Sequence, residues 1–90
     1  MTDAVKTYKP RDEARIQAML FDEQTAAAAL EWAGNEIRPI PIAPGHYEVF
    51  TLEGWVEIPI GHYLIRGTNQ EFYPCAPDVF VQRWEETPNG

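Results

Sequence analysis

The second half of the chain consists of short apolar and aromatic runs separated by turn residues. The runs are residues 47–52, 55–58, 62–66 and 71–75, and the breaks between them are Glu53-Gly54, Pro59-Ile60-Gly61 and Gly67-Thr68-Asn69-Gln70. Runs rich in β-branched and aromatic residues favour strands, and Gly, Pro and Asn favour the tight connections between them. The pattern therefore predicts four short strands in an antiparallel meander.

The clearest helix signal lies in the first half. Residues 26–33 contain four consecutive alanines, which lose no side-chain entropy in a helix, followed by Leu30. Thr25 or Asp22 is a suitable N-terminal cap, and Gly34 is a suitable stop. We expect one helix here.

Three other segments have weaker signals. Residues 14–20 alternate apolar and other side chains, which predicts a strand, although their Ala, Gln, Met and Leu content also suits a helix. Residues 37–45 contain three prolines and are expected as a connector or an edge segment. Residues 77–84 are expected to form a short helical turn, with a strand as the alternative.

The predicted fold class is α+β, with one helix packed on a small, mainly antiparallel sheet and a short helical turn near the C-terminus. The 90 residues suit one domain. We place a polar N-terminal arm at 1–13, the single domain at 14–86 and a flexible tail at 87–90.

Charge narrows the classes of partner. The formal net charge is −7, and no lysine follows Lys9. Nucleic acid needs several Lys or Arg contacts to phosphates, so direct nucleic-acid binding is disfavoured and a basic protein partner is favoured. A narrower form of this expectation is that the acidic surface mimics DNA toward such a partner. No apolar run is long enough to span a bilayer and no signal-peptide pattern is present, so we expect no membrane partner and a cytoplasmic location in the host cell.

Residues 52–85 resemble small phage and prophage proteins of the PGDYG type. The matching blocks are Leu52-Glu53-Gly54, Ile60-Gly61-His62-Tyr63-Leu64-Ile65-Arg66-Gly67, Glu71-Phe72-Tyr73-Pro74-Cys75, Pro77-Asp78-Val79-Phe80 and Trp84-Glu85. Ile60 stands where the family has Pro, and His62 where it has Asp, so no role of that carboxylate is carried over. The resemblance implies a phage or prophage origin and a compact α+β fold.

The candidate binding residues come mainly from these blocks. They are Trp55, Tyr63, Arg66, Glu71, Tyr73 and Asp78. In the functional interpretation Arg66 anchors an anionic group, Tyr73 stacks and Asp78 accepts a hydrogen bond. In the structural interpretation, which we favour, Arg66 and Glu71 form a cross-strand pair and Asp78 caps a helix.

Catalytic and metal sites are not predicted. Cys75 could act as a nucleophile with His46 or His62 as its base, but no nucleophile signature surrounds it, and a free cysteine is usually a small buried hydrophobe. The same three residues lack the closely spaced ligand pairs of structural zinc sites. We expect no enzyme activity and no cofactor.

Aromatic residues exceed what a simple meander core requires, and Trp55 and Trp84 are the candidates for exposure. An exposed aromatic cluster serves a protein partner or a second copy of the chain. The favoured function is thus a phage-encoded accessory protein that binds a host or phage protein through an acidic, aromatic-bearing face. The alternative is a small-molecule or nucleotide-binding module with a pocket around Arg66, Tyr73 and Asp78.

Overall fold

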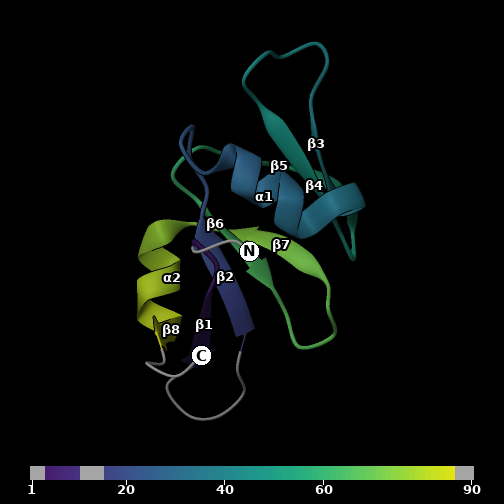
Figure 1. Cartoon of the computed structure of the whole chain (residues 1–90). Helices are drawn as coiled ribbons and strands as arrows, with labels where there is room; N and C mark the ends of the chain where they lie inside the picture. Colours follow the sequence, from purple (N-terminus) through teal and green to yellow (C-terminus); the bar gives the residue numbers. More distant parts are fainter. Residues whose placement is uncertain (1–3, 11–15, 87–90) are drawn as a thin grey trace.

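The structure of the chain is a computed structural model that describes residues 4–10 and 16–86 (Figure 1). The elements of this part, in chain order, are β1 (Lys6–Pro10), β2 (Ile16–Leu20), α1 (Ala26–Ala33), a 3₁₀ turn (Gly34–Glu36), β3 (Ile37–Pro39), β4 (Tyr47–Thr51), β5 (Gly54–Ile58), β6 (Tyr63–Arg66), β7 (Phe72–Cys75), α2 (Pro77–Arg83) and β8 (Trp84–Glu86). The predicted α+β class and the short C-terminal helix are confirmed.

The strands divide between two antiparallel sheets. Sheet A has the order β7-β6-β2-β1-β8, and sheet B has the order β3-β4-β5. The break at 59–61 carries the chain from sheet B to sheet A, where the Phe21 N–H donates to the His62 carbonyl at 2.8 Å and the Gly61 N–H donates to the Phe21 carbonyl at 2.7 Å. These bonds extend the β2–β6 ladder, so β6 pairs with a strand from the first half instead of continuing the meander.

The turn before α1 is built by the two residues considered as caps. The Asp22 carboxylate accepts hydrogen bonds from the N–H groups of Gln24 and Thr25, at 2.8 and 3.0 Å. The Thr25 hydroxyl donates to the Leu20 carbonyl at 2.8 Å, and no side-chain cap reaches the helix itself. Gly34 ends α1 with a φ of +57°, a conformation that glycine adopts readily, which confirms the predicted stop.

Two segments differ from their predicted roles. The predicted polar arm contains β1, which lies between β2 and β8 and is hydrogen-bonded to both. Pairing on both edges overrides a polar composition, because strand preference depends on neighbouring strands more than on the segment itself. Trp84, expected to end the helical turn, instead begins β8, and residues 87–90 lie outside the described part.

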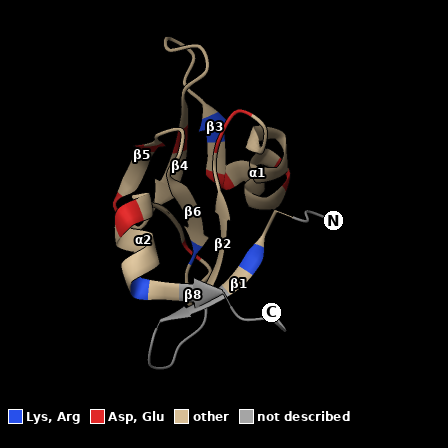
Figure 2. Cartoon of the chain, turned by 90° about the vertical axis from the view of Figure 1, so that its left-hand side faces the viewer, with Lys and Arg blue, Asp and Glu red and all other residues tan. Residues whose placement is uncertain are grey.

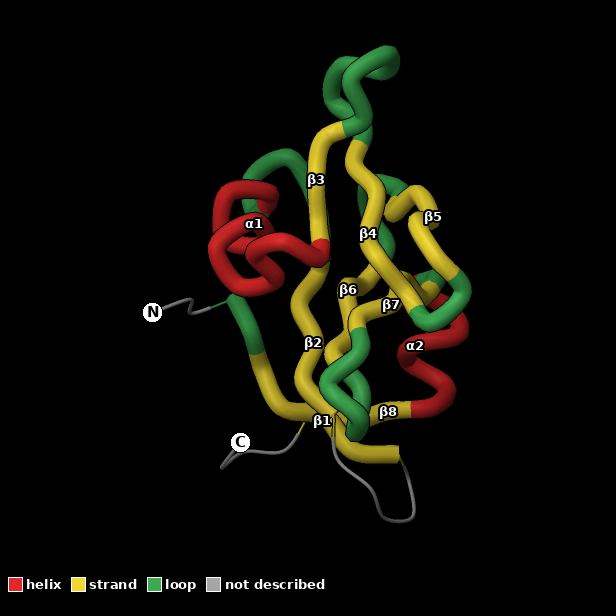
Figure 3. Tube along the Cα trace, turned by 90° about the vertical axis from the view of Figure 1, so that its right-hand side faces the viewer, coloured by secondary structure: helices red, strands yellow, loops and turns green. Residues whose placement is uncertain are grey.

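Sheet A separates two clusters of buried side chains. Its α1 face carries Gln17, Met19, Leu64, Arg66, Phe72 and Pro74, and its α2 face carries Ile16, Ala18, Tyr63, Ile65, Tyr73 and Cys75. Met19, Leu64 and Phe72 pack with α1 and with the inner face of sheet B, whereas Ala18 and Ile65 pack with Phe80 of α2. The two helices accordingly lie on opposite sides of the molecule (Figure 3).

Candidate functional site

The two faces of sheet A separate residues that the sequence grouped into one candidate site. Arg66 is paired with Gln17 of β2 and with Phe72 of β7, and its side chain belongs to the α1 face. Tyr73, one residue after Phe72, belongs to the α2 face, because successive side chains of a strand point to opposite faces. Arg66 and Tyr73 therefore do not converge on one ligand.

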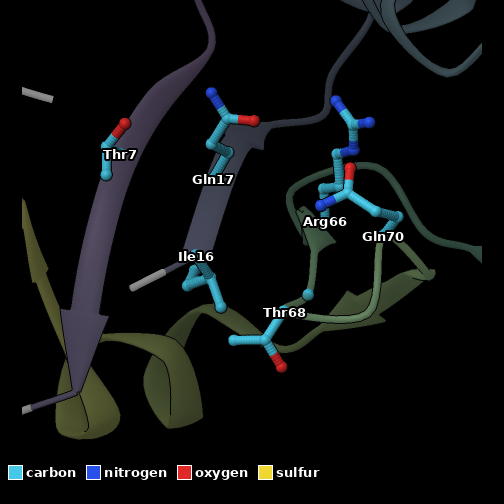
Figure 4. A pocket seen from close by; sticks show the side chains of 7 residues that line it. Thr7, Ile16, Gln17, Arg66, Thr68 and Gln70 are labelled. Carbon is cyan, nitrogen blue, oxygen red and sulfur yellow. The ribbon is translucent and has the colours of Figure 1, made fainter. Parts of the chain in front are cut away.

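Arg66 lines a pocket of about 390 Å³ at one end of the α1 face. The described residues that line it are Thr7, Ile16, Gln17, Arg66, Gly67, Thr68 and Gln70 (Figure 4). Met19 is fully buried on this face, whereas Gln17, two residues earlier on the same strand, is exposed. The pocket thus begins where the packed core ends.

Three of its side chains form a row across neighbouring strands. Thr7 of β1 is the register partner of Gln17 of β2, and Gln17 is the register partner of Arg66 of β6. Directly opposed side chains in a sheet have Cβ atoms about 4.5–5.5 Å apart, so one small group can contact two neighbours in the row. Figure 4 shows that Gln70, from the β6–β7 turn, lies beside Arg66, whereas Thr68 of the same turn lies nearer to Ile16.

The Arg66 guanidinium has no charged partner within the described part of the chain. The Arg66 Nε atom is buried and has no hydrogen-bond acceptor, a situation that typically costs about 1–3 kcal/mol. Among the described residues, ion pairs join Arg38 to Glu48 and His46 to Glu57, and Arg66 is in neither. Its ring contact is with Phe72, where Cζ lies 5.9 Å from the ring centroid.

The expected Arg66–Glu71 cross-strand pair is not formed. The register aligns Arg66 with Phe72, so Glu71 lies one residue before the strand pairing begins. The Glu71 carboxylate instead accepts a hydrogen bond from the Asn69 N–H at 3.0 Å, and the Gly67 N–H donates to the Glu71 carbonyl at 2.7 Å. Glu71 therefore fixes the β6–β7 turn.

Tyr63, Tyr73 and Cys75 pack on the α2 face. Burial raises the pKa of the Tyr73 phenol, to which the nearby Glu71 and Cys75 add, while Arg83 opposes the shift. Burial also raises the pKa of the Cys75 thiol, more than Arg83 lowers it. A raised pKa leaves less thiolate at neutral pH, and the Sγ atom lies 3.6 Å from the Ala76 carbonyl oxygen, so Cys75 has the features of a packed thiol.

Asp78 lies close enough to Cys75 to add to the rise of the thiol pKa, whereas His46 contacts a residue of sheet B. Asp78 is an exposed residue in the first turn of α2, where it makes no side-chain cap hydrogen bond. A carboxylate there still favours the helix through the macrodipole. His46 is hydrogen-bonded to Glu57 at 2.5 Å on sheet B, so it is not the base of Cys75 on sheet A.

Trp55 belongs to a second surface, the outer face of sheet B, which we define by Arg38, Glu48, Phe50, Trp55 and Glu57. The Phe50 and Trp55 rings are register partners with centroids 5.3 Å apart. The Arg38 guanidinium carbon lies 3.7 Å from the Trp55 ring centroid, and Arg38 Nε lies 2.6 Å from the Glu48 carboxylate. Phe50 is 44% exposed, so the aromatic pair is accessible.

A second pocket, of about 330 Å³, lies between the β4–β5 turn and β7. It is lined by Thr51, Leu52, Glu53, Val56, Glu71, Phe72, Tyr73 and Pro74. Tyr73 and Glu71 thus share a pocket with the tip of sheet B, whereas Arg66 lines the other one. Of the predicted site residues, only these two are brought together in a pocket.

The described Lys and Arg residues are spread over the fold, with Lys6 on β1, Arg38 on β3, Arg66 on β6 and Arg83 at the end of α2 (Figure 2). Within residues 4–10 and 16–86, no three His, Cys, Asp or Glu side chains gather in a way that could hold a metal ion. Neither of the described α-helices has the length and apolarity needed to cross a membrane. Comparisons with protein-family models, with curated proteins and with solved structures found no match.

Several residues of the Arg66 pocket and of the outer face of sheet B were not predicted from the sequence. The row of Thr7, Gln17 and Arg66 depends on the pairing of β2 with β6, strands that are distant in sequence, and such a pairing leaves no local signal. Phe50 could have been found, because a tight turn at Glu53-Gly54 sets Phe50 opposite Trp55. Arg38 could be assigned to this face only by knowing that the proline-rich segment begins with an edge strand.

Proposed function

We propose that this chain is a phage- or prophage-encoded accessory protein that binds a basic protein partner through the outer face of sheet B. The single observation that carries the proposal is the accessible cross-strand pair of Phe50 and Trp55 at the β5 side of that face. Aromatic side chains supply much of the binding energy in protein interfaces. The phage origin is supported by the sequence blocks that resemble PGDYG-type proteins.

The surroundings of the aromatic pair favour a protein over a small ligand. Leu52, at the β4–β5 turn, and Ile42, in the loop between β3 and β4, are 79% and 94% exposed, respectively. They lie beyond opposite ends of β4, and Leu52 also lines the second pocket. A broad surface of this kind suits a protein partner, whereas small ligands need a concave site.

Charge supports a basic partner. Glu48 and Glu57 stand directly opposite one another on the outer face, and Arg38 and His46 contact them from either side. A Lys or Arg side chain of a partner could contact the same carboxylates from above. The chain's net charge of −7 would also attract such a partner over a distance.

The test is capture from a lysate of the bacterial host, with quantitative mass spectrometry, using the wild type and two variants of the face, Phe50→Ala and Trp55→Ala. The matched control is Val81→Ala, which removes a 58%-exposed apolar side chain from α2, outside the outer face of sheet B. Circular dichroism must first show that all variants are folded. We expect a basic protein that the wild type and Val81→Ala capture and that both face variants lose.

Direct placement of the partner makes the test stricter. A photo-crosslinking amino acid at position 50 should form an adduct with the captured protein, and the same amino acid at position 81 should not. Equal capture by the wild type and by both face variants would refute the proposal.

A further inference from the structure

We propose that the Arg66 pocket binds the carboxylate group of a small organic acid. This inference is independent of the protein partner, because the pocket lies on sheet A and shares no lining residue with the outer face of sheet B. It rests on the arrangement of Thr7, Gln17 and Arg66 in one cross-strand row, closed on one side by the β6–β7 turn (Figure 4).

The electrostatics of the pocket select an anion. Its described lining contains one charged side chain, Arg66, and no carboxylate. Within the described residues the Arg66 guanidinium forms no ion pair with a carboxylate, in a chain that carries twice as many acidic as basic residues. A guanidinium presents a planar set of N–H donors that matches a carboxylate in a bidentate geometry.

The neutral groups around Arg66 favour a carboxylate over a phosphate. Gln17, Gln70 and Thr68 provide amide and hydroxyl donors, which stabilise an oxyanion without adding charge. One guanidinium balances the single charge of a carboxylate, whereas a phosphate monoester carries nearly two at neutral pH. The excess of carboxylates elsewhere on the protein would penalise that second charge.

The stem of Arg66 is held in place for this role. Arg66 Nε is buried and the guanidinium lies near the Phe72 ring, so the outward-facing donors are the terminal nitrogens. Holding a side chain in its bound position before the ligand arrives reduces the entropy lost on binding. The volume of about 390 Å³ admits a small acid but falls near the lower end of ligand pockets.

The test is a nuclear magnetic resonance titration of the ¹⁵N-labelled full chain with N-acetylglycine at constant ionic strength. We expect saturable shifts of the Arg66 Nε–H signal and of the Gln17, Gly67 and Thr68 backbone amides, with millimolar affinity. N-Acetylglycinamide, the neutral analogue, should leave these signals unchanged. Inorganic phosphate is titrated in parallel.

Matched variants separate the pocket from general charge effects. Arg66→Gln should weaken N-acetylglycine binding at least tenfold, whereas Arg38→Gln, which removes the same charge on sheet B, should retain it. Gln17→Glu places a tethered carboxylate opposite Arg66, so it should abolish N-acetylglycine binding and raise the melting temperature of the protein. This variant keeps Arg66, so its result does not depend on how well Arg66→Gln folds.

Three results would overturn the proposal. The first is a linear, unsaturable response to N-acetylglycine. The second is equal loss of binding in Arg38→Gln and Arg66→Gln, or unchanged binding in Gln17→Glu. The third is tighter binding of phosphate than of N-acetylglycine, which would refute the carboxylate assignment.

Discussion

The ring of Tyr63 lies parallel to the ring of Phe80, with the centroids 3.8 Å apart and the planes inclined by 8°. Tyr63 comes from β6 of sheet A, and Phe80 comes from α2. The stack therefore attaches the C-terminal helix to the sheet, and it assigns Tyr63 a structural contact where the sequence suggested a binding residue.

Phe80→Ala should reduce the free energy of unfolding by about 3–5 kcal/mol, because Phe80 is 2% exposed and its removal leaves a cavity between α2 and sheet A. Val81→Ala, on the exposed side of the same helix, should change it by less than about 0.5 kcal/mol. Urea unfolding followed by circular dichroism measures both. Similar losses in the two variants would mean that α2 is not anchored through Phe80.

Gly67→Ala should destabilise the protein only while Glu71 is present. A Cβ atom at position 67 would come within 2.7 Å of the Glu71 Cδ atom and closer still to a carboxylate oxygen. The carboxylate must then move and release the Asn69 N–H.

In a Glu71→Ala background the same Gly67→Ala change should instead stabilise by about 0.4–1 kcal/mol, because alanine restricts the unfolded chain more than glycine does. Urea midpoints of the four proteins in the double-mutant cycle test this change of sign. An equal effect of Gly67→Ala in both backgrounds would show that the two residues are not coupled.

Arg38→Ala should lower the free energy of unfolding by about 1 kcal/mol, because it removes the guanidinium from the Trp55 ring. It also leaves Glu48 facing Glu57 without its cation. Adding Glu48→Gln should restore part of the loss by removing that repulsion. If the double variant is no more stable than Arg38→Ala, the repulsion contributes nothing measurable.

Stability should fall as the pH rises into the alkaline range. The folded state raises the pKa of both Cys75 and Tyr73, mainly by burial, so it holds their protons more tightly than the unfolded chain does. Above the ordinary thiol pKa of about 8.5, Cys75 ionises in the unfolded chain before it ionises in the folded protein. The stability gained from holding the proton therefore falls and is lost as the pH passes the folded-state pKa.

The check is the urea midpoint from pH 7 to pH 10.5 in the presence of a reductant. Cys75→Ala and Tyr73→Phe should each show a shallower decline than the wild type, with the Cys75 difference appearing at the lower pH. Parallel curves for all three proteins would contradict the assignment to these two groups.

The sequence predicted the local elements better than their partners. The β2, β4, β5, β6 and β7 strands and both helices were expected near their observed positions, because periodicity and turn residues act within a few positions. The division into two sheets was not expected, since the β2–β6 pairing joins residues separated by the whole of α1 and sheet B. The β1 strand was also missed, because its composition is polar and one of its two neighbours, β8, comes from the other end of the described chain.

The candidate site shows the same limit. Arg66 was selected for the chemistry of its guanidinium, but its companions were chosen by nearness in sequence. Strand alternation places Tyr73 on the other face, and strand pairing supplies Gln17 and Thr7 in its place. Trp55 was placed on an accessible surface, because the tight turn before it determines its face.

The position of β1 between β2 and β8 has a consequence for how the chain is made. β8, the second neighbour of β1, emerges from the ribosome long after β1, because every other described element lies between the two in the sequence. Until then one side of β1 presents unpaired backbone groups, which are a template for pairing with another polypeptide. The nascent chain is therefore most exposed to misassociation along the edge that the last strand finally covers.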